Sequence, residues 1–462
     1  MKRTYTTDIS KYEGEAVTLM GWVNVRRDHG KLLFVDLRDR TGVAQVVFFA
    51  GGKNLYEIAD RLRSEWVIKV SGTVKKRPDN MRNPNIPTGD WEIDAQNLEI
   101  ISEAKTAPIP LETDGRDIEE EMRLKYRYLD LKRARMQKNI RLRHKATSFA
   151  REYLDGQGFV EIETPLLTKT SPEGARDFLV PSRKYPGTFF ALPQSPQQYK
   201  QLLMIAGFER YYQIARALRD EDLRGDRQCE HTQIDMEMSF MTEQEVRDLT
   251  EEMMIAIVEG CGKKVLIKPF PVFTHEEALA KFGADKFDLR DEPKDTSTLA
   301  FAWVVDFPLF EWDEEEKHFT FAHNPFSAPK QEHVEKLLNG QDLESLRAQQ
   351  YDLVCNGYEL ASGGVRISNP EVQRKIFEIL GLTPAQTEER FGHILEAYNY
   401  GAPFHAGIAP GLDRLVMLLA GESNIAEVIA FPKTGTARDP MMNAPSEADK
   451  KQLDELGIQI KK

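Results

Sequence analysis

The sequence predicts an α+β protein with two domains, a small N-terminal β-barrel and a larger body in which helices lie outside an antiparallel sheet. Residues 16–49 and 66–101 are short runs rich in Val, Ile, Leu and Phe, punctuated by Gly, Asp and Pro, which is typical of a closed barrel. Further on, strands and helices alternate irregularly around a hairpin at 216–240, which favours an antiparallel sheet over a doubly wound parallel one.

The predicted domains are 1–105 and 136–462. Between them, residues 106–135 begin as proline-broken chain and pass into a charged helical stretch, as a hinge would. Within the body, the stretch before Gly156 and Gly158 has apolar residues at helical spacing, and the two glycines end that helix. A strand ending at Pro165 should follow.

Composition excludes several classes of protein. The 462 residues are 41% apolar, enough for globular burial in more than one core, and they contain no run near twenty apolar residues that could span a membrane. The N-terminal stretch MKRTYTTDISKYEGE has no apolar segment after its basic residues, so we expect no signal peptide and a cytoplasmic protein. The three cysteines lack CxxC spacing, which argues against a zinc site.

Charge is distributed unevenly along the chain. The net charge is −12, yet residues 1–105 hold 17 Lys and Arg against 15 Asp and Glu. Barrels of the OB type bind single-stranded nucleic acid with an aromatic side chain on a strand face and basic residues around it. Residues of these kinds are Phe34, Arg26, Arg27, Lys75, Lys76 and Arg77. The pattern indicates either such a surface or ordinary solvated charge.

The hairpin RALRDEDLRGDRQCEHTQIDMEMSF, from Arg216 to Phe240, carries an unusual alternation. In an extended strand, Gln233, Asp235 and Glu237 share one face while the intervening Ile and Met residues pack on the other. We therefore expect a strand with a solvated, charged inner face.

Neither of the usual glycine loops for phosphate binding occurs in the chain. Side-chain cations must take their place if a nucleotide binds, and Arg219 and Arg414 suit that role because a guanidinium matches phosphate oxygens in pairs. Asp352 and Glu359 offer the hard oxygen ligands that Mg²⁺ prefers. Taken alone, these acids could equally be surface residues.

Three segments together resemble motifs 1, 2 and 3 of the class II aminoacyl-tRNA synthetases: GFVEIETPLL (158–167), RALRDED…HTQIDMEMSF (216–240) and GIAPGLDRLVML (407–418). Four more look like the bacterial-type aspartyl-tRNA synthetases: SPEGARDF (171–178), ALPQSPQQYKQLLM (191–204), YELASGGVRI (358–367) and VIAFPKT (428–434). The resemblance covers nearly the whole chain in the right order. It implies an N-terminal OB-fold barrel that reads the anticodon and a class II antiparallel-sheet catalytic domain.

The resemblance also implies the reaction. The α-carboxylate of L-aspartate would attack the α-phosphorus of ATP, and the aspartyl group would then pass to the 3′ end of tRNA-Asp, with tRNA-Asn left open as a second acceptor. Arg219, Glu221 and Arg414 would act in catalysis. Implied ATP-binding residues are Arg219, Asp220, Glu221, Gln228, His231, Glu359, Gly411, Leu412, Asp413 and Arg414. Implied aspartate-binding residues are Glu173, Gln197, Lys200, Arg219, Asp235, His323 and Arg366.

Metal and tRNA roles follow from the same resemblance. Asp352 and Glu359 would hold Mg²⁺. Phe34, Gln45 and Glu92 would contact anticodon bases, while His29 and Met81 bear on tRNA discrimination. His29 matches relatives that charge both tRNA-Asp and tRNA-Asn, and Met81 does not match them. Motif 1 in this family builds a homodimer, so Pro165 and the helix before it are interface candidates.

The chain departs from the family pattern in four places. The domain that bacterial-type relatives insert in the catalytic half is missing near 288–300. His231 replaces the usual phenylalanine beneath adenine, which predicts weaker ATP binding. Asn324 and Pro410 also differ from many relatives.

Two other functions remain open. A related synthetase for asparagine or lysine is one, although Arg366 and Lys200 would repel a lysine ammonium. The other is a non-catalytic tRNA- or RNA-binding paralogue, which the joint retention of the ATP and metal residues disfavours.

Overall fold

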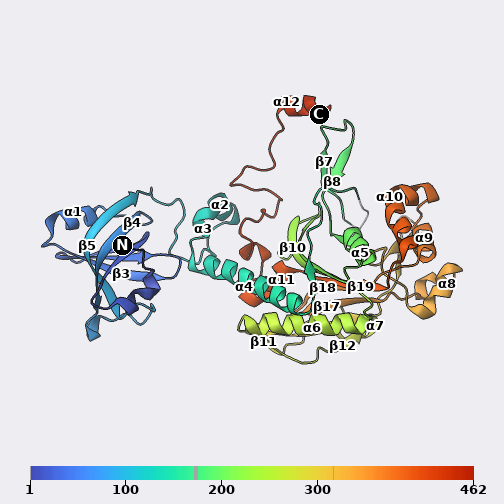
Figure 1. The fold of residues 1–462 in the computed structure, drawn as a ribbon, viewed down its shortest axis with the longest axis horizontal. Coiled ribbons are helices and arrows are strands. Elements are labelled where there is room, and N and C mark those ends of the chain that lie inside the picture. Colours follow the sequence, from blue (N-terminus) through green and yellow to red (C-terminus); the bar gives the residue numbers. More distant parts are fainter. Residues whose placement is uncertain (1, 171–174, 316, 462) are drawn as a thin grey trace. The chain divides into compact units, whose positions relative to one another are not determined.

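The computed structural model describes residues 2–170, 175–315 and 317–461. They form two compact units, Met1–Pro108 and Ile109–Lys462. Each unit is described by itself below, with elements labelled as in Figure 1.

The first unit is a barrel that closes, over its described residues, in the strand order β1–β2–β3–β5–β4. Its strands are β1 (Ala16–Asp28), β2 (Leu32–Arg38), β3 (Val43–Phe49), β4 (Val67–Lys76) and β5 (Trp91–Ser102). The helix α1 (Lys53–Asp60) joins β3 to β4. Alternation along β2 buries Leu33, Val35 and Leu37 inside the barrel and leaves Phe34 on its outside. The predicted OB-type barrel is confirmed.

Most of the predicted hinge, 106–135, belongs to the second unit. It contains α2 (Glu120–Lys125) and α3 (Arg127–Asp130), and α4 (Ala134–Gly156) begins at its end. The Asp130 carboxylate is fully buried and accepts hydrogen bonds from Arg127 Nη1 (2.6 Å) and Arg133 Nε (2.7 Å). Arg123 bonds Asp130 and also Glu427, 2.8 Å away. The stretch is thus fastened to the C-terminal part of the unit, because its buried arginines require fixed partners.

The second unit is built on a sheet that, in the described part of the chain, has eight strands in the order β12–β14–β17–β18–β19–β10–β9–β6. Neighbours are antiparallel except for the parallel pairs β12–β14 and β6–β9 at the two edges. The strands are β6 (Val160–Glu161), β9 (Arg210–Leu218), β10 (Glu230–Ser239), β12 (Val272–Thr274), β14 (Phe301–Val305), β17 (Gln350–Cys355), β18 (Tyr358–Val365) and β19 (His405–Pro410). The predicted antiparallel sheet is confirmed.

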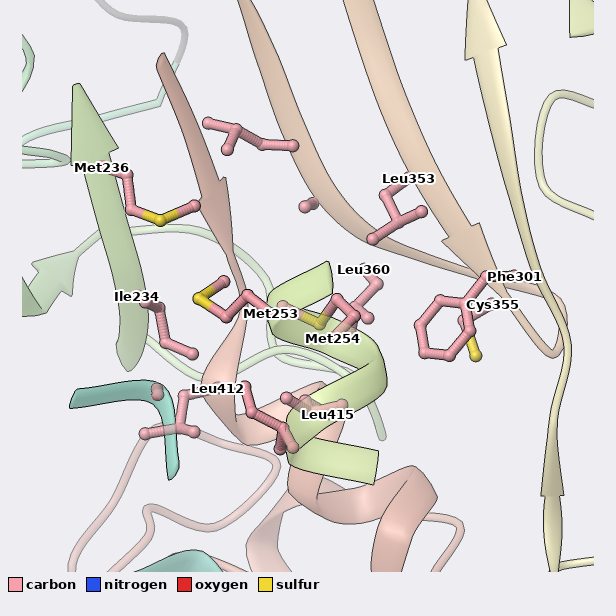
Figure 2. Packing of buried hydrophobic residues seen from close by; sticks show 14 of the residues in the cluster. Ile234, Met236, Met253, Met254, Phe301, Leu353, Cys355, Leu360, Leu412 and Leu415 are labelled. Carbon is pink, nitrogen blue, oxygen red and sulfur yellow. The ribbon is translucent and has the colours of Figure 1, made fainter. Parts of the chain in front are cut away.

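Three helices cover one face of this sheet: α4, α6 (Glu243–Gly260) and α11 (Leu412–Ala420). Figure 2 shows Ile234 and Met236 of β10 pointing toward Met253 and Met254 of α6. Leu412, which was predicted to bind ATP, is buried in this core beside Leu415 of the same helix. Burial of these apolar side chains leaves the other face of β10 to its charged residues.

The remaining helices and strands surround the sheet. They are α5 (Gln197–Ile205), α7 (His275–Phe282), α8 (Val334–Leu338), α9 (Pro370–Ile379), α10 (Pro384–Ala397), α12 (Lys450–Leu456), β7 (Leu179–Pro181), β8 (Phe189–Ala191), β11 (Lys264–Val265), β13 (Thr298–Leu299), β15 (Phe310–Asp313) and β16 (His318–Phe321). Residues 283–300 join α7 to β14 through the two-residue strand β13. In bacterial-type relatives an inserted domain is expected near 288–300. In this chain the segment is only this short connection.

Candidate active site

A cavity of about 230 Å³ opens beside the charged face of β10, with walls from α5, the β9–β10 hairpin, β18 and the start of α11. Predicted residues that line it are Gln197, Lys200, Arg219, Glu221, Gln228, His231, Asp235, His323, Glu359, Arg366, Gly411, Asp413 and Arg414. Residues more than 200 positions apart therefore meet in one place. Asp220 is exposed and Asp352 lies behind the wall, while Glu173 is outside the described residues.

The charged face of β10 is buried, contrary to the solvated face expected. Asp235 and Glu237 are both 0% exposed. Lys200 Nζ of α5 lies 2.9 Å from Asp235 Oδ2 and 3.2 Å from Glu237 Oε2. Arg366 donates from Nε to Glu237 Oε1 (2.9 Å) and from Nη2 to Glu237 Oε2 (3.2 Å). The acids leave water because two buried cations compensate them.

Glu237 is a site residue to which the sequence analysis assigned no role. Its signal was the alternation with Gln233 and Asp235, which placed it on the charged face. Glu237 occupies the Nε side of the Arg366 guanidinium, so two Nη1 protons and one Nη2 proton remain for a second anion. Arg366 can therefore still grip a ligand carboxylate bidentately from its other edge.

The backbone of β19 leaves space for the Glu237 carboxylate. Gly407 lies opposite Glu237 in the antiparallel register of β10 and β19. A Cβ added at Gly407 would lie 1.9 Å from Glu237 Oε2 and 2.4 Å from the Met236 carbonyl oxygen. A side chain at 407 and the carboxylate at 237 are thus mutually exclusive.

Burial and charge act differently on the two acids. Burial raises the pKa of Asp235 above its ordinary value, and Lys200 offsets only part of that effect. Burial also acts to raise the pKa of Glu237, but Arg366 and Lys200 outweigh it, so the pKa of Glu237 falls. Glu237 is consequently the firmly ionised partner of the two cations.

Two arginines face the cavity from other elements. Arg414, on α11, donates from Nη1 to the Glu359 carbonyl oxygen (2.7 Å), and its Nη2 lies 3.0 Å from Asp226 Oδ2. Arg219 follows β9, and its Nε is buried with no hydrogen-bond partner among the described residues. A buried guanidinium N–H that lines a cavity without a partner fits a phosphate oxygen.

Two predicted ATP-binding residues brace the cavity wall. Asp413 accepts a hydrogen bond from the Thr232 amide at Oδ2 (2.7 Å) and another from Arg143 of α4 at Oδ1, so it joins α11 to β10 and α4. The Gln228 side chain donates to the Lys433 carbonyl oxygen (3.1 Å) and accepts from the Lys433 amide (2.9 Å). The side-chain nitrogen and oxygen of Gln228 thus both bond the backbone of Lys433.

The carboxylates predicted to hold a metal lie on neighbouring strands. Ser362 Oγ donates to Asp352 Oδ1 (2.6 Å) and lies 2.6 Å from His323 Nε2. Ser362 therefore links Asp352 to His323, which lines the cavity. Burial, then the nearby Glu359 charge, raises the pKa of Asp352 well above its ordinary value. Burial acts in the same direction on Glu359, but Lys286 reverses the effect and the pKa of Glu359 falls.

This donor set fits magnesium. Mg²⁺ is commonly held by one or two carboxylates together with substrate phosphates, rather than by a cage of protein ligands. Among the residues that the structure describes, no group of three or more His, Cys, Asp or Glu side chains is arranged for a metal ion. Asp352 and Glu359 offer two carboxylates on neighbouring strands, and Glu359 lines a cavity that also contains Arg219 Nε, unpaired among the described residues.

His231 lines the cavity in a neutral state. Burial, followed by the positive charges of Arg219 and Arg414, lowers the pKa of His231 to about 3. The imidazole thus presents a flat, uncharged ring through the neutral pH range. The titratable charge expected from the sequence is suppressed by its surroundings.

In the barrel unit, Phe34, Gln45 and Glu92 lie on the outward side of β2, β3 and β5. Gln45 pairs with Glu92 across β3 and β5, and its Nε2 donates to Glu92 Oε2 (2.9 Å). The Phe34 ring meets the His29 ring edge-on, with centroids 5.4 Å apart. Met81 is exposed at the end of the turn Asp79–Met81.

None of the described helices in either unit is long and apolar enough to cross a membrane.

Comparison with known families matches both units. Residues 119–435 match the model described as "tRNA synthetases class II (D, K and N)". Residues 17–101 match the model described as "OB-fold nucleic acid binding domain". Among solved structures, asparaginyl-tRNA synthetase from Pyrococcus horikoshii superposes with a TM-score of 0.75, covering 94% of this chain and 98% of its own, at 23% identity. That likeness shows the fold.

Curated relatives are more similar in sequence. The chain is 43% identical over 571 residues to "Aspartate--tRNA(Asp/Asn) ligase" of Rubrobacter xylanophilus, covering 97% of this chain and 95% of the relative. It is 40% identical over 573 residues to "Aspartate--tRNA ligase" of Staphylococcus carnosus, covering 97% of both. Alignments of this length exceed the 462 residues of the chain, so each relative carries more than a hundred residues that are missing here. The extent of these matches, together with the two domain models, shows that the chain belongs to the class II aminoacyl-tRNA synthetases, in the aspartate–tRNA ligase family.

Proposed function

We propose that the chain is an ATP-dependent aspartate–tRNA ligase. The observation that carries this proposal is a single cavity lined by two sets of cations: Lys200 and Arg366 beside the acids of β10, and Arg219 and Arg414 on the hairpin and α11. The first set offers donors to a small dicarboxylic amino acid, and the second offers donors to a nucleotide's phosphates. The relatives from Rubrobacter xylanophilus and Staphylococcus carnosus are named for aspartate, which agrees with the first of these substrates.

In the first step, the α-carboxylate of aspartate attacks the α-phosphorus of ATP, giving aspartyl-adenylate and pyrophosphate. Arg219 would bind the α-phosphate and Arg414 the terminal phosphate, while Arg366 and Lys200 orient the side-chain carboxylate and Asp235 faces the α-ammonium. Gln197 and His323 complete the amino-acid pocket. Glu221 would bind the adenine edge and neutral His231 would stack on the ring. Catalysis then rests on positioning and charge neutralisation rather than on a protein nucleophile.

Asp352 and Glu359 would hold Mg²⁺. When bound, the ion would neutralise part of the negative charge of the triphosphate. Arg414, which bonds the Glu359 backbone, links the metal residues to the phosphate site.

In the second step, the 3′-hydroxyl of tRNA takes the aspartyl group. Phe34, Gln45 and Glu92 on the barrel would contact the anticodon by stacking and hydrogen bonding. We propose tRNA-Asp as the acceptor and tRNA-Asn as a second one. The Rubrobacter relative is named for both tRNA-Asp and tRNA-Asn, which favours both acceptors, as does His29, whereas Met81 does not match the dual pattern.

We further propose a cytoplasmic homodimer. A ligase that charges tRNA works where translation takes place, and the motif 1 segment ending near Pro165 supplies a two-fold interface in the family that the chain resembles.

The test is amino-acid-dependent exchange of pyrophosphate into ATP, followed by charging of purified tRNA-Asp and tRNA-Asn transcripts. We expect exchange with aspartate and only background with asparagine or lysine. Exchange driven by asparagine would support the asparagine enzyme instead. Retention of tRNA on a filter without any exchange would support a non-catalytic binding protein.

A further inference from the structure

A lysine outside the predicted site contacts one of the metal acids. Lys286 Nζ lies 2.9 Å from Glu359 Oε2, with the lysine side chain 40% exposed and the glutamate side chain 26% exposed. The negative charges of Glu359, Asp285 and Asp352 all act on this ammonium. Lys286 therefore stands where a cation bound by Asp352 and Glu359 would be attracted.

The backbone around Lys286 is held in place. The next residue, Phe287, is buried and stacks on Phe282 of α7, with ring centroids 4.0 Å apart. The Phe287 carbonyl oxygen accepts a hydrogen bond from the Gly357 amide (3.0 Å), in the turn that leads into β18 and Glu359. The lysine is thus fixed next to the strand whose carboxylate it contacts, although its own side chain can move into solvent.

We propose that Lys286 is a positioning residue that holds Glu359 ready and keeps the Asp352–Glu359 pair free of divalent cation until the nucleotide arrives. This inference rests on the metal role that the proposed function gives to the pair. A bare divalent ion must displace the ammonium and endure its repulsion. An ion that arrives with a triphosphate brings negative charge. The phosphates attract the displaced Lys286 ammonium and so offset the loss of its contact with Glu359.

The test is Mn²⁺ binding to the full chain without nucleotide or amino acid, measured by electron paramagnetic resonance of the free ion. In Lys286→Met, we expect one Mn²⁺ site tighter than in the parent chain by at least about tenfold. Lys286→Arg keeps a cation there and should bind Mn²⁺ as the parent does. Lys281→Met removes a lysine of the neighbouring helix α7 and should also leave binding unchanged. Lys286→Gln serves as a second neutral variant if Lys286→Met does not fold.

The acidic surface of the chain can also bind Mn²⁺, so the gained site needs its own control. In the double variant Lys286→Met with Glu359→Gln, the tight site should disappear. The proposal is overturned if both neutral variants bind Mn²⁺ like the parent, or if the tight site persists without Glu359. Failure of the proposed function would show separately, as a lack of aspartate-dependent exchange with the Mn²⁺ result intact.

Discussion

At the residue scale, the proposed amino-acid pocket depends on the guanidinium of Arg366. Arg366 uses one edge of its guanidinium for Glu237 and keeps the other edge for a ligand. Arg366→Lys preserves the charge and loses the fork. We expect the KM for aspartate in pyrophosphate exchange to rise by about 10- to 100-fold, the cost of a charged hydrogen bond, with the KM for ATP unchanged. An equal rise in both constants would contradict a role confined to the amino acid.

His231 ties the nucleotide pocket to acid stability. The pKa of His231 is about 3 in the folded chain, below the ordinary value of 6.5. Below pH 6.5 the unfolded chain therefore binds a proton at this residue that the folded chain does not bind. The stability it contributes is complete above pH 6.5 and is lost as pH falls toward 3. His231→Phe cannot titrate there.

Urea unfolding of both chains at pH 7.5 and pH 5 measures this effect. Between the two pH values the parent should lose roughly 1–2 kcal/mol more free energy of unfolding than His231→Phe. We also expect the KM for ATP to change with pH in parallel in the parent and in His231→Phe, because the His231 ring stays neutral over this range and the ATP phosphates titrate equally in both assays. Parallel pH dependence of stability in the two chains would contradict the buried neutral state.

Residue types revealed most of the cavity but not the division of labour within it. Arg219 and Arg414 could be named from residue type because a guanidinium binds phosphate oxygens in pairs, whereas Arg366 was named from the family resemblance. Glu237 and Lys286 received no role. Alternation along β10 placed Glu237 on the charged face, but its partner Arg366 lies 129 positions away in the sequence. Nothing around Lys286 in the sequence pointed to Glu359. Leu412 was assigned to ATP binding from its position in a motif, and the structure places it in the core under α11.

At the scale of elements, the close approach of β10 and β19 sets the geometry of the charged cluster. Gly407→Ala would drive a methyl group into the Glu237 carboxylate, 1.9 Å away, and disturb the Arg366–Glu237 bond. We expect aspartate-dependent exchange to fall by about 100-fold or more and thermal stability to drop, because a buried ion pair is broken. Gly435→Ala is the matched control, since nothing lies within 4 Å of a Cβ there. Equal activity of the two variants would remove Gly407 from the argument.

Elements with local signals were predicted well. The alternation along β10 follows from the periodicity of a strand. α4 ends at Gly156, and Gly158 soon after it has a φ of 78°, a left-handed conformation that glycine adopts without strain. The segment 106–135 looked like a hinge because it is polar and contains prolines. What packs it is a buried cluster in which Asp130 is held by three arginines, one of which also bonds Glu427 some 300 residues away. Pairing over that separation leaves no trace in a local pattern.

At the scale of the whole molecule, the two groups of predicted site residues fall in different compact units. Every described residue of the candidate active site lies in Ile109–Lys462, whereas Phe34, Gln45 and Glu92 lie in Met1–Pro108. We therefore expect a chain of residues 109–462 to keep aspartate-dependent pyrophosphate exchange close to that of the full chain. Its kcat/KM for charging tRNA-Asp should fall by about 100-fold, since stacking on one aromatic is worth about 1–3 kcal/mol per base. Full-length Phe34→Ala should show a smaller fall in charging with exchange intact. Loss of exchange in a shortened chain that still melts cooperatively would mean that the barrel contributes to amino-acid activation itself, and the division of labour would be wrong.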